Sequence, residues 1–395
     1  MSRTYIKSHP WITFSLDLTC RTQTLWMLLG EAKSKCEHLA NVILAPDAAK
    51  QLHEIYLAKG VLATTAIEGN TLTEEEVLKQ IEGKLRLPPS REYLGQETEN
   101  IISACNFILQ DIKGGNPPAL NIETVKNFNH RVLDKLKLDE GIIPGEIRKG
   151  SVGVGRYRAA PSEDCEYLLE RLCAWLSGST FSVPDGKPQL DLVFAIIKAI
   201  LAHLYLAWIH PFGDGNGRTA RLVELLILVS SGVPSSAAHL LSNHYNQTRS
   251  EYYRQLDTSS KSGGDVIPFL TYALQGFVDG LRSQIDFIHK QQWQIAWENY
   301  VHEQLEGHSS VVNARRYNLV IAISSYDQLV PVQKLLEERP RVANAYATRT
   351  SKTLTRDLNA LVDKGLVEQV ANKYRAKKEV MLAFRPVVAK PNRPR

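Results

Sequence analysis

His210-Pro-Phe-Gly-Asp-Gly-Asn-Gly-Arg-Thr-Ala-Arg221 is the stretch on which the fold of this chain depends. It lies between two strongly apolar segments. The segment before it, 192–209, is apolar almost all round, which predicts a helix buried at the centre of a domain. The segment after it, 222–229, is apolar again and precedes Gly232 and Pro234, a pair that commonly ends helices. The pattern predicts two buried helices joined by one short polar loop.

The residues of this loop are suited to binding phosphate. Closely spaced glycines before a helix let backbone N–H groups converge on an anion, and the helix N-terminus adds partial positive charge. Arg218 and Arg221 fall on one helix face, where they can bind further phosphate oxygens. Asp214 offers a hard oxygen ligand for a phosphate-bound Mg²⁺, and His210 can accept a proton from a hydroxyl. The loop therefore predicts transfer chemistry on a nucleoside triphosphate.

A structural interpretation of the same residues is a hairpin turn. Asp-Gly and Asn-Gly are frequent in such turns, and a single histidine is usually structural. A hairpin needs alternating strands on both sides, however, and long apolar blocks flank this loop. The combined spacing favours a functional loop.

The pattern His-Pro-Phe-x-Asp-Gly-Asn-Gly-Arg-x-x-Arg at 210–221 resembles the signature of the Fic (filamentation induced by cAMP) family and departs from it at no position. Members typically transfer AMP from ATP to a hydroxyl of a target protein, a reaction called AMPylation. The resemblance implies His210 as the base and Asp214 as the Mg²⁺ ligand. It also implies an anion nest of Gly215, Asn216 and Gly217, with Arg218 and Arg221 on the β- and γ-phosphates.

Composition and length are those of an ordinary globular protein. The 395 residues predict two or three domains. The cysteines are odd in number, scattered and free of C-x-x-C pairs: Cys20, Cys36, Cys105, Cys165 and Cys173. This favours reduced thiols in the cytoplasm over a disulfide framework or a zinc site. The N-terminus lacks the apolar core of a signal peptide. Segment 192–209 approaches transmembrane length, but it contains Lys198 and His203, so a buried helix is expected.

Residues 20–110 are predicted to be helical. Asp47 is placed to cap one helix, and Thr73 with Glu76 forms a capping box for the next. Between them, Thr64-Thr-Ala-Ile-Glu-Gly-Asn70 has the composition of a helix C-terminus, with Glu68 solvated. The segment also resembles the inhibitory motif Ser/Thr-x-x-x-Glu-Gly/Asn of Fic proteins. That resemblance implies that Glu68 pairs with Arg221 and holds the γ-phosphate of ATP out of its productive position.

The stretch 145–161 carries the clearest β signal of the catalytic part. Apolar and small residues alternate around Val152 and Val154, which predicts a short β-hairpin. Its glycines and basic residues match neither G-x-G-x-x-G nor the P-loop, so a solvated basic turn is one interpretation. The family resemblance implies instead the flap that pairs with target backbone and places Val152 and Val154 against adenine.

Helices are predicted after the signature at 246–256 and 265–281, with 282–306 continuing as a polar connector helix. Tyr252 and Tyr253 resemble the paired tyrosines that follow the signature in Fic domains. Because adjacent tyrosines usually divide between core and surface, only Tyr253 is assigned to the adenine pocket.

A basic module begins near residue 311. Residues 311–395 contain 17 Lys and Arg against 7 Asp and Glu, a net charge of +10, which leaves about −5 for the rest. Helices are predicted at 317–325, 330–338 and 351–364, then strands near 367–370 and 379–384, with a disordered tail at 390–395. This order resembles a winged helix with 350–364 in the recognition position. The basic residues that suit DNA phosphates are Arg349, Lys352, Arg356 and a tip of Lys373, Arg375, Lys377 and Lys378; protein docking or dimerisation is the alternative.

The whole sequence predicts a mainly α-helical protein. It comprises an N-terminal region with the inhibitory motif (1–110), a Fic core with a β-hairpin flap (111–285), a connector helix (286–310) and a winged helix (311–390). The expected activity is ATP- and Mg²⁺-dependent AMPylation of Ser, Thr or Tyr on targets and on the protein itself, in the cytoplasm, under inhibition by Glu68. The sequence leaves the oligomeric state open, a homodimer included, and no membrane partner is expected. The alternatives are a de-AMPylase or another phosphate-group transferase on the same fold, or a DNA-binding regulator whose core senses ATP.

Overall fold

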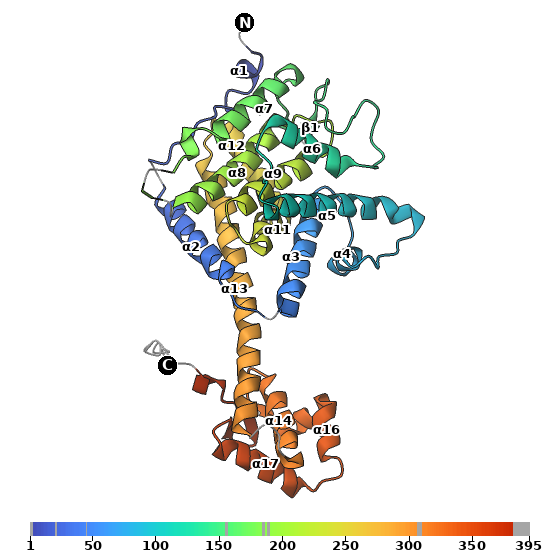
Figure 1. Cartoon of the computed structure of the whole chain (residues 1–395), viewed down its shortest axis with the longest axis vertical. Helices are drawn as coiled ribbons and strands as arrows, with labels where there is room; N and C mark the ends of the chain where they lie inside the picture. The colour runs from blue at the N-terminus through green and yellow to red at the C-terminus, as the bar shows by residue number, and fades with distance from the viewer. Residues whose placement is uncertain are drawn as a thin grey trace. The chain divides into compact units, whose positions relative to one another are not determined.

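The computed structural model describes residues 3–19, 22–44, 46–154, 157–183, 186–187, 190–305 and 310–381. The chain divides into two compact units, Met1–Asp286 and Phe287–Arg395, and the boundary falls within one long helix. As the sequence predicts, helices dominate both units (Figure 1).

The first unit consists of helices and one β-hairpin. Its elements are α1 (Tyr5–Ser8), α2 (Gln23–Ala40), α3 (Pro46–Ala66), α4 (Glu74–Ile81), η1 (Pro89–Arg91), α5 (Glu92–Lys113), α6 (Ile122–Leu133), β1 (Gly153–Val154), β2 (Tyr157–Arg158), α7 (Ser162–Leu176), η2 (Ser179–Phe181), α8 (Asp191–Ile209), α9 (Asn216–Ser230), α10 (Ser235–Ala238), α11 (Leu240–Gln247), α12 (Arg249–Lys261) and α13 (Ile267–Gln304).

The centre of this unit is the pair α8 and α9, which pack side by side (Figure 1). Helices α2 and α7 pack on α8, while α3, α5 and α6 pack on α9. Helix α8 is apolar all round because it is surrounded: Ile196, Ile200 and Leu204 are fully buried. By length and composition α8 could cross a membrane, but 78% of its most apolar window is buried inside the protein. The predicted arrangement of two buried helices joined by a polar loop is confirmed.

The α8–α9 connection is short because its backbone turns sharply at both ends. His210 ends α8 in the left-handed region at φ 50°, and Pro211 cannot continue a helix. Gly215 precedes α9 at φ 73°, and a Cβ there would lie 3.1 Å from side-chain atoms of Asn129, Val132 and Leu133. Glycine is required at 215 by both backbone conformation and close packing against α6.

The N-terminal helices match the expected pattern with one correction. The capping box at Thr73 and Glu76 is present at the start of α4. Asp47, expected as an N-cap, instead lies inside the first turn of α3, which begins at Pro46. Proline suits the first helical position because its missing N–H would have no partner there. The four described cysteines are buried and free, and Cys20 lies outside the described residues.

Two further expectations concern the segments around the signature. The β1–β2 hairpin is present, with Gly153 opposite Arg158 and Val154 opposite Tyr157. The helix expected at 246–256 is wrong in its bounds, because Thr248 lies between α11 and α12 at φ −116°. Helix α13 continues without a break from the core into the segment expected as a connector, 286–310, and ends at Gln304.

The second unit combines short helices with a three-stranded antiparallel sheet. After the end of α13 its elements are α14 (Val311–Ser324), β3 (Val330–Pro331), α15 (Val332–Glu338), α16 (Pro340–Tyr346), α17 (Ser351–Asp363), β4 (Val367–Val370), β5 (Lys373–Ala376) and η5 (Lys378–Met381). The strands lie in the order β3-β5-β4.

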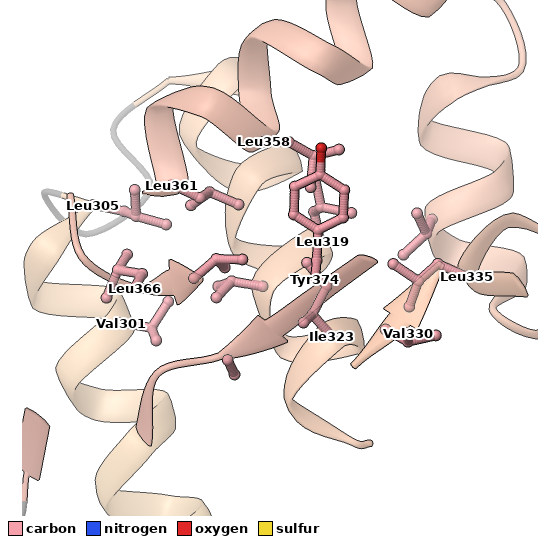
Figure 2. Close-up of a cluster of buried hydrophobic side chains, with 14 of the residues drawn as sticks. Val301, Leu305, Leu319, Ile323, Val330, Leu335, Leu358, Leu361, Leu366 and Tyr374 are labelled. Atoms are coloured by element: carbon pink, nitrogen blue, oxygen red, sulfur yellow. The ribbon is translucent and has the colours of Figure 1, made fainter. Parts of the chain in front are cut away.

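One hydrophobic cluster holds the second unit together (Figure 2). Trp297, Val301 and Leu305 at the end of α13 pack in it with residues of α14, α17 and the sheet. Each of these three side chains is fully buried. The end of α13 therefore belongs to the core of this unit.

The expected strand at 379–384 is wrong in its described part, 379–381, which lies in the 3₁₀ helix Lys378–Met381. The strand that pairs with β4 is β5 at Lys373–Ala376. Lys373 and Arg375 therefore lie on a strand, and the connection between β4 and β5 is only Ala371 and Asn372. The remainder of the expected strand and the tail 390–395 lie outside the described residues. Alternation around Tyr374 is too short a pattern to have indicated β5.

Candidate active site

The loop between α8 and α9 is closed on itself by Asn216. Its side chain accepts from the Phe212 N–H at 2.9 Å and donates to the Phe212 carbonyl at 2.8 Å. From α6, Asn129 donates to the Asp214 carbonyl at 2.9 Å and accepts from the Gly145 N–H at 2.9 Å. These bonds fix the loop against α6 and the segment that leads to the hairpin. The Asn216 side chain is thus used inside the loop, which leaves its backbone N–H for an anion.

His210 is held at the end of α8 with its imidazole at a cavity. Its backbone N–H donates to Leu206 at 2.9 Å, and its carbonyl accepts from Arg148 Nε at 2.8 Å. Burial lowers the pKa of His210 to about 4, although Glu68 and Asp214 oppose the shift. The imidazole is therefore neutral near pH 7, as a general base must be.

Arg148 joins the base of the hairpin to this loop. Besides His210, its guanidinium donates to the backbone carbonyls of Gly150 and Ala160, and its own N–H donates to Pro211 at 3.0 Å. The side chain is buried. The interpretation of 145–161 as a solvated basic turn is therefore wrong for Arg148, which is a structural clamp.

A cavity of about 680 Å³ opens beside the loop. Its lining includes these residues assigned from the sequence: Glu68, Val152, His210, Asp214, Gly215, Asn216, Gly217, Arg221 and Tyr253. Arg218 is not among the lining residues, and of Val154 only the backbone is described. Segments more than 180 residues apart in the sequence thus meet around one space large enough for a nucleotide.

Glu68 occupies the end of this cavity at the N-terminus of α9. Its carboxylate accepts a short hydrogen bond from Arg221 Nη2, which also donates to the Thr64 carbonyl at 3.0 Å. Burial on its own would raise the pKa of Glu68, but Arg221 lowers it below the ordinary value. A Cβ on Gly217 would lie 2.3 Å from Glu68 Oε1. The carboxylate therefore sits directly on the helix terminus that would bind a phosphate.

Arg218 is part of a second ion-pair network and does not line the cavity. Its Nη1 lies 3.3 Å from Glu97 Oε1, and its Nη2 lies 3.1 Å from Asp214 Oδ1. Among the buried polar atoms that the structure describes, Nε of Arg218 and Nε of Arg221 are without a hydrogen-bond partner. Both arginines thus retain a donor that is not used within the protein.

A buried polar cluster lies one turn beyond Arg221. Glu224 is 1% exposed, accepts from the Tyr245 hydroxyl at 3.0 Å and lies 3.9 Å from His203 Nδ1. Tyr252 bonds to His203 Nε2 at 2.9 Å. Burial raises the pKa of Glu224 to about 8 and lowers that of His203 to about 3. The pair is therefore uncharged at neutral pH, as its burial requires.

Asp214 fits a magnesium ion that is bound mainly by substrate. Its carboxylate is 44% exposed at the cavity. Within the described residues, no group of three or more His, Cys, Asp or Glu is arranged to hold a metal. One carboxylate together with substrate phosphates and water is a common way for proteins to hold Mg²⁺.

Several lining residues were not assigned from the sequence: Tyr157, Trp208, Leu256, Asp257 and Lys261. The last three follow Tyr253 by three, four and eight residues, so helical spacing from Tyr253 would have found them. Trp208 gave no such signal because it lies in the apolar run of α8.

The segment that contains this site is similar to known proteins. The sequence model of the Fic/DOC family matches residues 119–228. Protein adenylyltransferase fic-1 of Caenorhabditis briggsae is 29% identical over 280 residues, which cover 68% of this chain and 50% of that protein. The namesake from Caenorhabditis elegans is 28% identical over 235 residues, 58% of this chain and 42% of its own length. The chain thus spans half or less of the length of these two relatives.

Solved structures agree on the fold. A Fic family protein from Desulfovibrio desulfuricans G20 matches with a TM-score of 0.54 and 21% identity, over 92% of this chain and 98% of its own. A fragment of Fic-1 from C. elegans matches with a TM-score of 0.54 and 25% identity, over 69% and 77%.

Proposed function

We propose that this chain, whose residues 119–228 match the Fic/DOC family model, is a protein adenylyltransferase that moves AMP from ATP to a Ser, Thr or Tyr hydroxyl of target proteins and of itself. One observation carries the proposal. His210, Asp214, Arg221 and the N-terminus of α9 converge on a single cavity of about 680 Å³. The relatives named protein adenylyltransferase support the reaction class.

The cavity offers a place for each part of ATP. The first N–H groups of α9 have no intrahelical acceptor and are free to bind the polyphosphate, and Arg221 adds charge there. Tyr253, 38% exposed, offers a face for adenine, with Val152 on the opposite hairpin. We assign the Val154 backbone, in β1, to the same end.

The reaction is an in-line displacement at the α-phosphorus. Neutral His210 takes the proton of the target hydroxyl, the hydroxyl oxygen forms a bond to the α-phosphorus, and the bond to the bridging oxygen breaks to release pyrophosphate. Positioning and charge neutralisation supply most of the acceleration. Asp214 would hold Mg²⁺, which supplies charge neutralisation on the phosphates when bound.

Glu68 is proposed to inhibit this reaction. Its carboxylate takes the place and the arginine that a γ-phosphate needs. A hydrogen bond between charged groups contributes about 1.5–3 kcal/mol, and each ~1.4 kcal/mol is a factor of ten in population. One Glu68–Arg221 contact therefore keeps the competent state at roughly a few per cent.

Replacing Glu68 tests both activity and inhibition. We expect Glu68→Gly to raise labelling of the full chain by [α-³²P]ATP at least about tenfold, with no label from [γ-³²P]ATP. Adding His210→Ala should abolish labelling but not ATP binding. Glu82→Gly, an exposed glutamate after α4, is the matched control and should resemble wild type. Equal labelling of wild type and Glu68→Gly would refute the inhibitory role.

Removal of AMP is the alternative reaction that one observation favours. The Glu68 side chain is 33% exposed at the same cavity as His210, so it can orient a water molecule. Incubation with a pre-AMPylated protein distinguishes the two: release of AMP that requires Glu68 supports removal, and its absence supports transfer alone. A pure ATP sensor would instead keep its regulatory output in His210→Ala.

DNA is a proposed partner of the second unit, which we interpret as a winged helix with α17 as its recognition helix. Lys352, Thr355, Arg356 and Asn359 line a shallow depression of about 500 Å³ on the exposed face of α17. Arg375, expected at the basic tip, is instead paired with Glu368 and Glu379 at 2.7 and 3.0 Å.

Charge reversal on α17 tests this partner. We expect the full chain to bind duplex DNA with an affinity that falls steeply as salt rises. In the double variant Lys352→Glu/Arg356→Glu, the slope of log affinity against log salt concentration should decrease by the equivalent of about two phosphate contacts. Lys334→Glu, on α15, is the control. Binding that is absent at low salt, or unchanged by the reversal, would exclude DNA at α17 and favour a protein partner.

A further inference from the structure

Arg218 is an arginine shared by two carboxylates. It lies on the first turn of α9, its side chain is 5% exposed, and it contacts Glu97 from α5 and Asp214 from the loop. The Glu97 side chain is 21% exposed and Asp214 is 44% exposed. The two carboxylates therefore differ: Glu97 lies inside the protein, and Asp214 faces the cavity.

Glu97 also holds the turn that carries Glu68. Its Oε2 accepts from Asn70 Nδ2 at 2.9 Å, and the same amide donates to the Leu94 carbonyl of α5 at 3.0 Å. The side-chain oxygen Oδ1 of Asn70 accepts from the Leu72 N–H at 3.0 Å. Glu97 is thus the point at which α5, the turn after α3 and the N-terminus of α9 are joined by hydrogen bonds.

A buried guanidinium has to keep a counter-charge. Removing one partner of a buried ion pair is strongly unfavourable, because the remaining charge is left uncompensated. In its proposed role Asp214 shares its carboxylate with Mg²⁺, which weakens the compensation that it gives Arg218. That weakening is inexpensive only if another carboxylate stays on Arg218, and Glu97 is the one the structure provides.

We propose that Glu97 is a positioning residue for the metal ligand. It neutralises Arg218 permanently, so that Asp214 is free to exchange Arg218 for Mg²⁺ when the nucleotide binds. The inference rests on the proposed function. In this proposal Arg218 holds the loop through Glu97 and does not contact phosphate directly. This agrees with the absence of Arg218 from the residues that line the cavity.

The magnesium dependence of nucleotide binding tests the proposal. Glu97→Gln can keep an oxygen for Asn70. It replaces the oxygen that accepts from Arg218 with an amide nitrogen and removes the negative charge beside Arg218. We combine it with Glu68→Gly in the full chain and measure ATP binding by titration calorimetry at a series of Mg²⁺ concentrations. The expected result is a rise of about tenfold in the Mg²⁺ concentration needed for half-maximal binding, with the same shift in α-³²P labelling.

Two variants separate this role from a structural one. Glu99 lies two residues further along α5, and its exposed side chain is hydrogen-bonded to Gln80. Glu99→Gln should therefore leave the Mg²⁺ concentration for half-maximal ATP binding, the Mg²⁺ midpoint, unchanged. Glu97→Asp restores the charge and should return the midpoint toward that of the Glu68→Gly parent. It also provides the measurement if Glu97→Gln does not fold, because its midpoint should still stay below that of any folded neutral variant such as Glu97→Ala.

The outcomes are distinct. If the Glu68→Gly parent binds ATP with Mg²⁺ and Glu97→Gln has the same Mg²⁺ midpoint, the inference is wrong and the proposed function stands. If the parent neither binds ATP nor becomes labelled, the proposed function fails and the inference fails with it.

Discussion

His210, the proposed base, shows how its surroundings set the state of a single residue. Its left-handed backbone ends α8, and Arg148 anchors its carbonyl. Burial keeps the imidazole neutral at pH values where an exposed histidine would be half protonated. The residue is thus available as a base over a wide pH range.

The pH dependence of labelling tests this state of His210. With its pKa lowered to about 4, the neutral fraction hardly changes between about pH 7.5 and pH 6, whereas an ordinary pKa of about 6.5 would reduce it about fourfold. We expect the single-turnover labelling rate of Glu68→Gly to fall by less than about 1.5-fold over that range. A fourfold fall would show that the ring has an ordinary pKa.

At the residue scale, the sequence predicts what lies in one contiguous motif and misses what arrives from elsewhere. Loop 210–221 was assigned from its own residues and spacing and Glu68 from a family resemblance, and the structure brings them to one cavity. Arg148 and Glu97 contact the loop from segments 62 and 121 residues away in the sequence. A single basic or acidic residue has no spacing signal, so only the fold reveals these two.

At the scale of elements, the N-terminus of α9 is the part of the site best suited to bind an anion. It presents unpaired N–H groups, its dipole favours an anion, and Glu68 now occupies it. Gly217 has an ordinary helical backbone, so backbone conformation does not explain why this residue is glycine. Close contact does, because a Cβ would lie 2.3 Å from Glu68 Oε1 and 3.1 Å from Arg221 Nη1.

A double-mutant cycle at Gly217 tests that contact. In a helix, alanine is more stable than glycine by about 0.5–1 kcal/mol. We expect Gly217→Ala to destabilise the otherwise native chain, because the methyl displaces Glu68, but to be neutral or stabilising in Glu68→Gly. The coupling should be about 1 kcal/mol or more in urea unfolding. The same effect in both backgrounds would mean that Glu68 does not rest on α9.

Elements with long periodic signals were predicted well, and short ones were not. Helices α8 and α9 and the capping box of α4 follow directly from apolar runs and caps. The break at Thr248 and the strand β5 were missed. Each depends on packing against neighbours in the fold and leaves no Gly or Pro signal in the sequence.

At the scale of the whole molecule, the division into units also depends on packing. The charge shift begins near 311, but the second unit begins at Phe287, because Trp297 and Val301 on α13 enter its core. The charge composition of a segment reflects mainly its solvent-facing residues. A boundary between two cores inside one continuous helix does not change those residues, so composition does not reveal it.

The stability of the molecule should depend on pH through the cluster behind Arg221. Burial raises the pKa of Glu224 to about 8 from an ordinary value near 4.5. Its contribution to stability is therefore complete below the unfolded pKa and is lost as pH rises toward the folded pKa. His203 has the opposite sign, because its lowered pKa costs stability only as pH falls below about 6.5.

Glu224→Gln tests the first of these effects. Between about pH 6.5 and 7.5 the free energy of unfolding should fall by roughly 1 kcal/mol more in wild type than in Glu224→Gln. The amide keeps an acceptor for Tyr245, so its packing is preserved. Parallel stability curves from urea unfolding, resolved for the first unit, would show that Glu224 is ionised in the folded protein.

The central claim is that the cavity beside the α8–α9 loop transfers AMP to a protein hydroxyl. Intact mass spectrometry of the full-length Glu68→Gly chain, incubated with ATP and Mg²⁺, tests it most directly. We expect a mass gain of one AMP group with stoichiometric release of pyrophosphate, and neither product when His210→Ala is added. An unmodified mass from folded, ATP-bound Glu68→Gly protein, or a gain equal to one phosphate group, would contradict it.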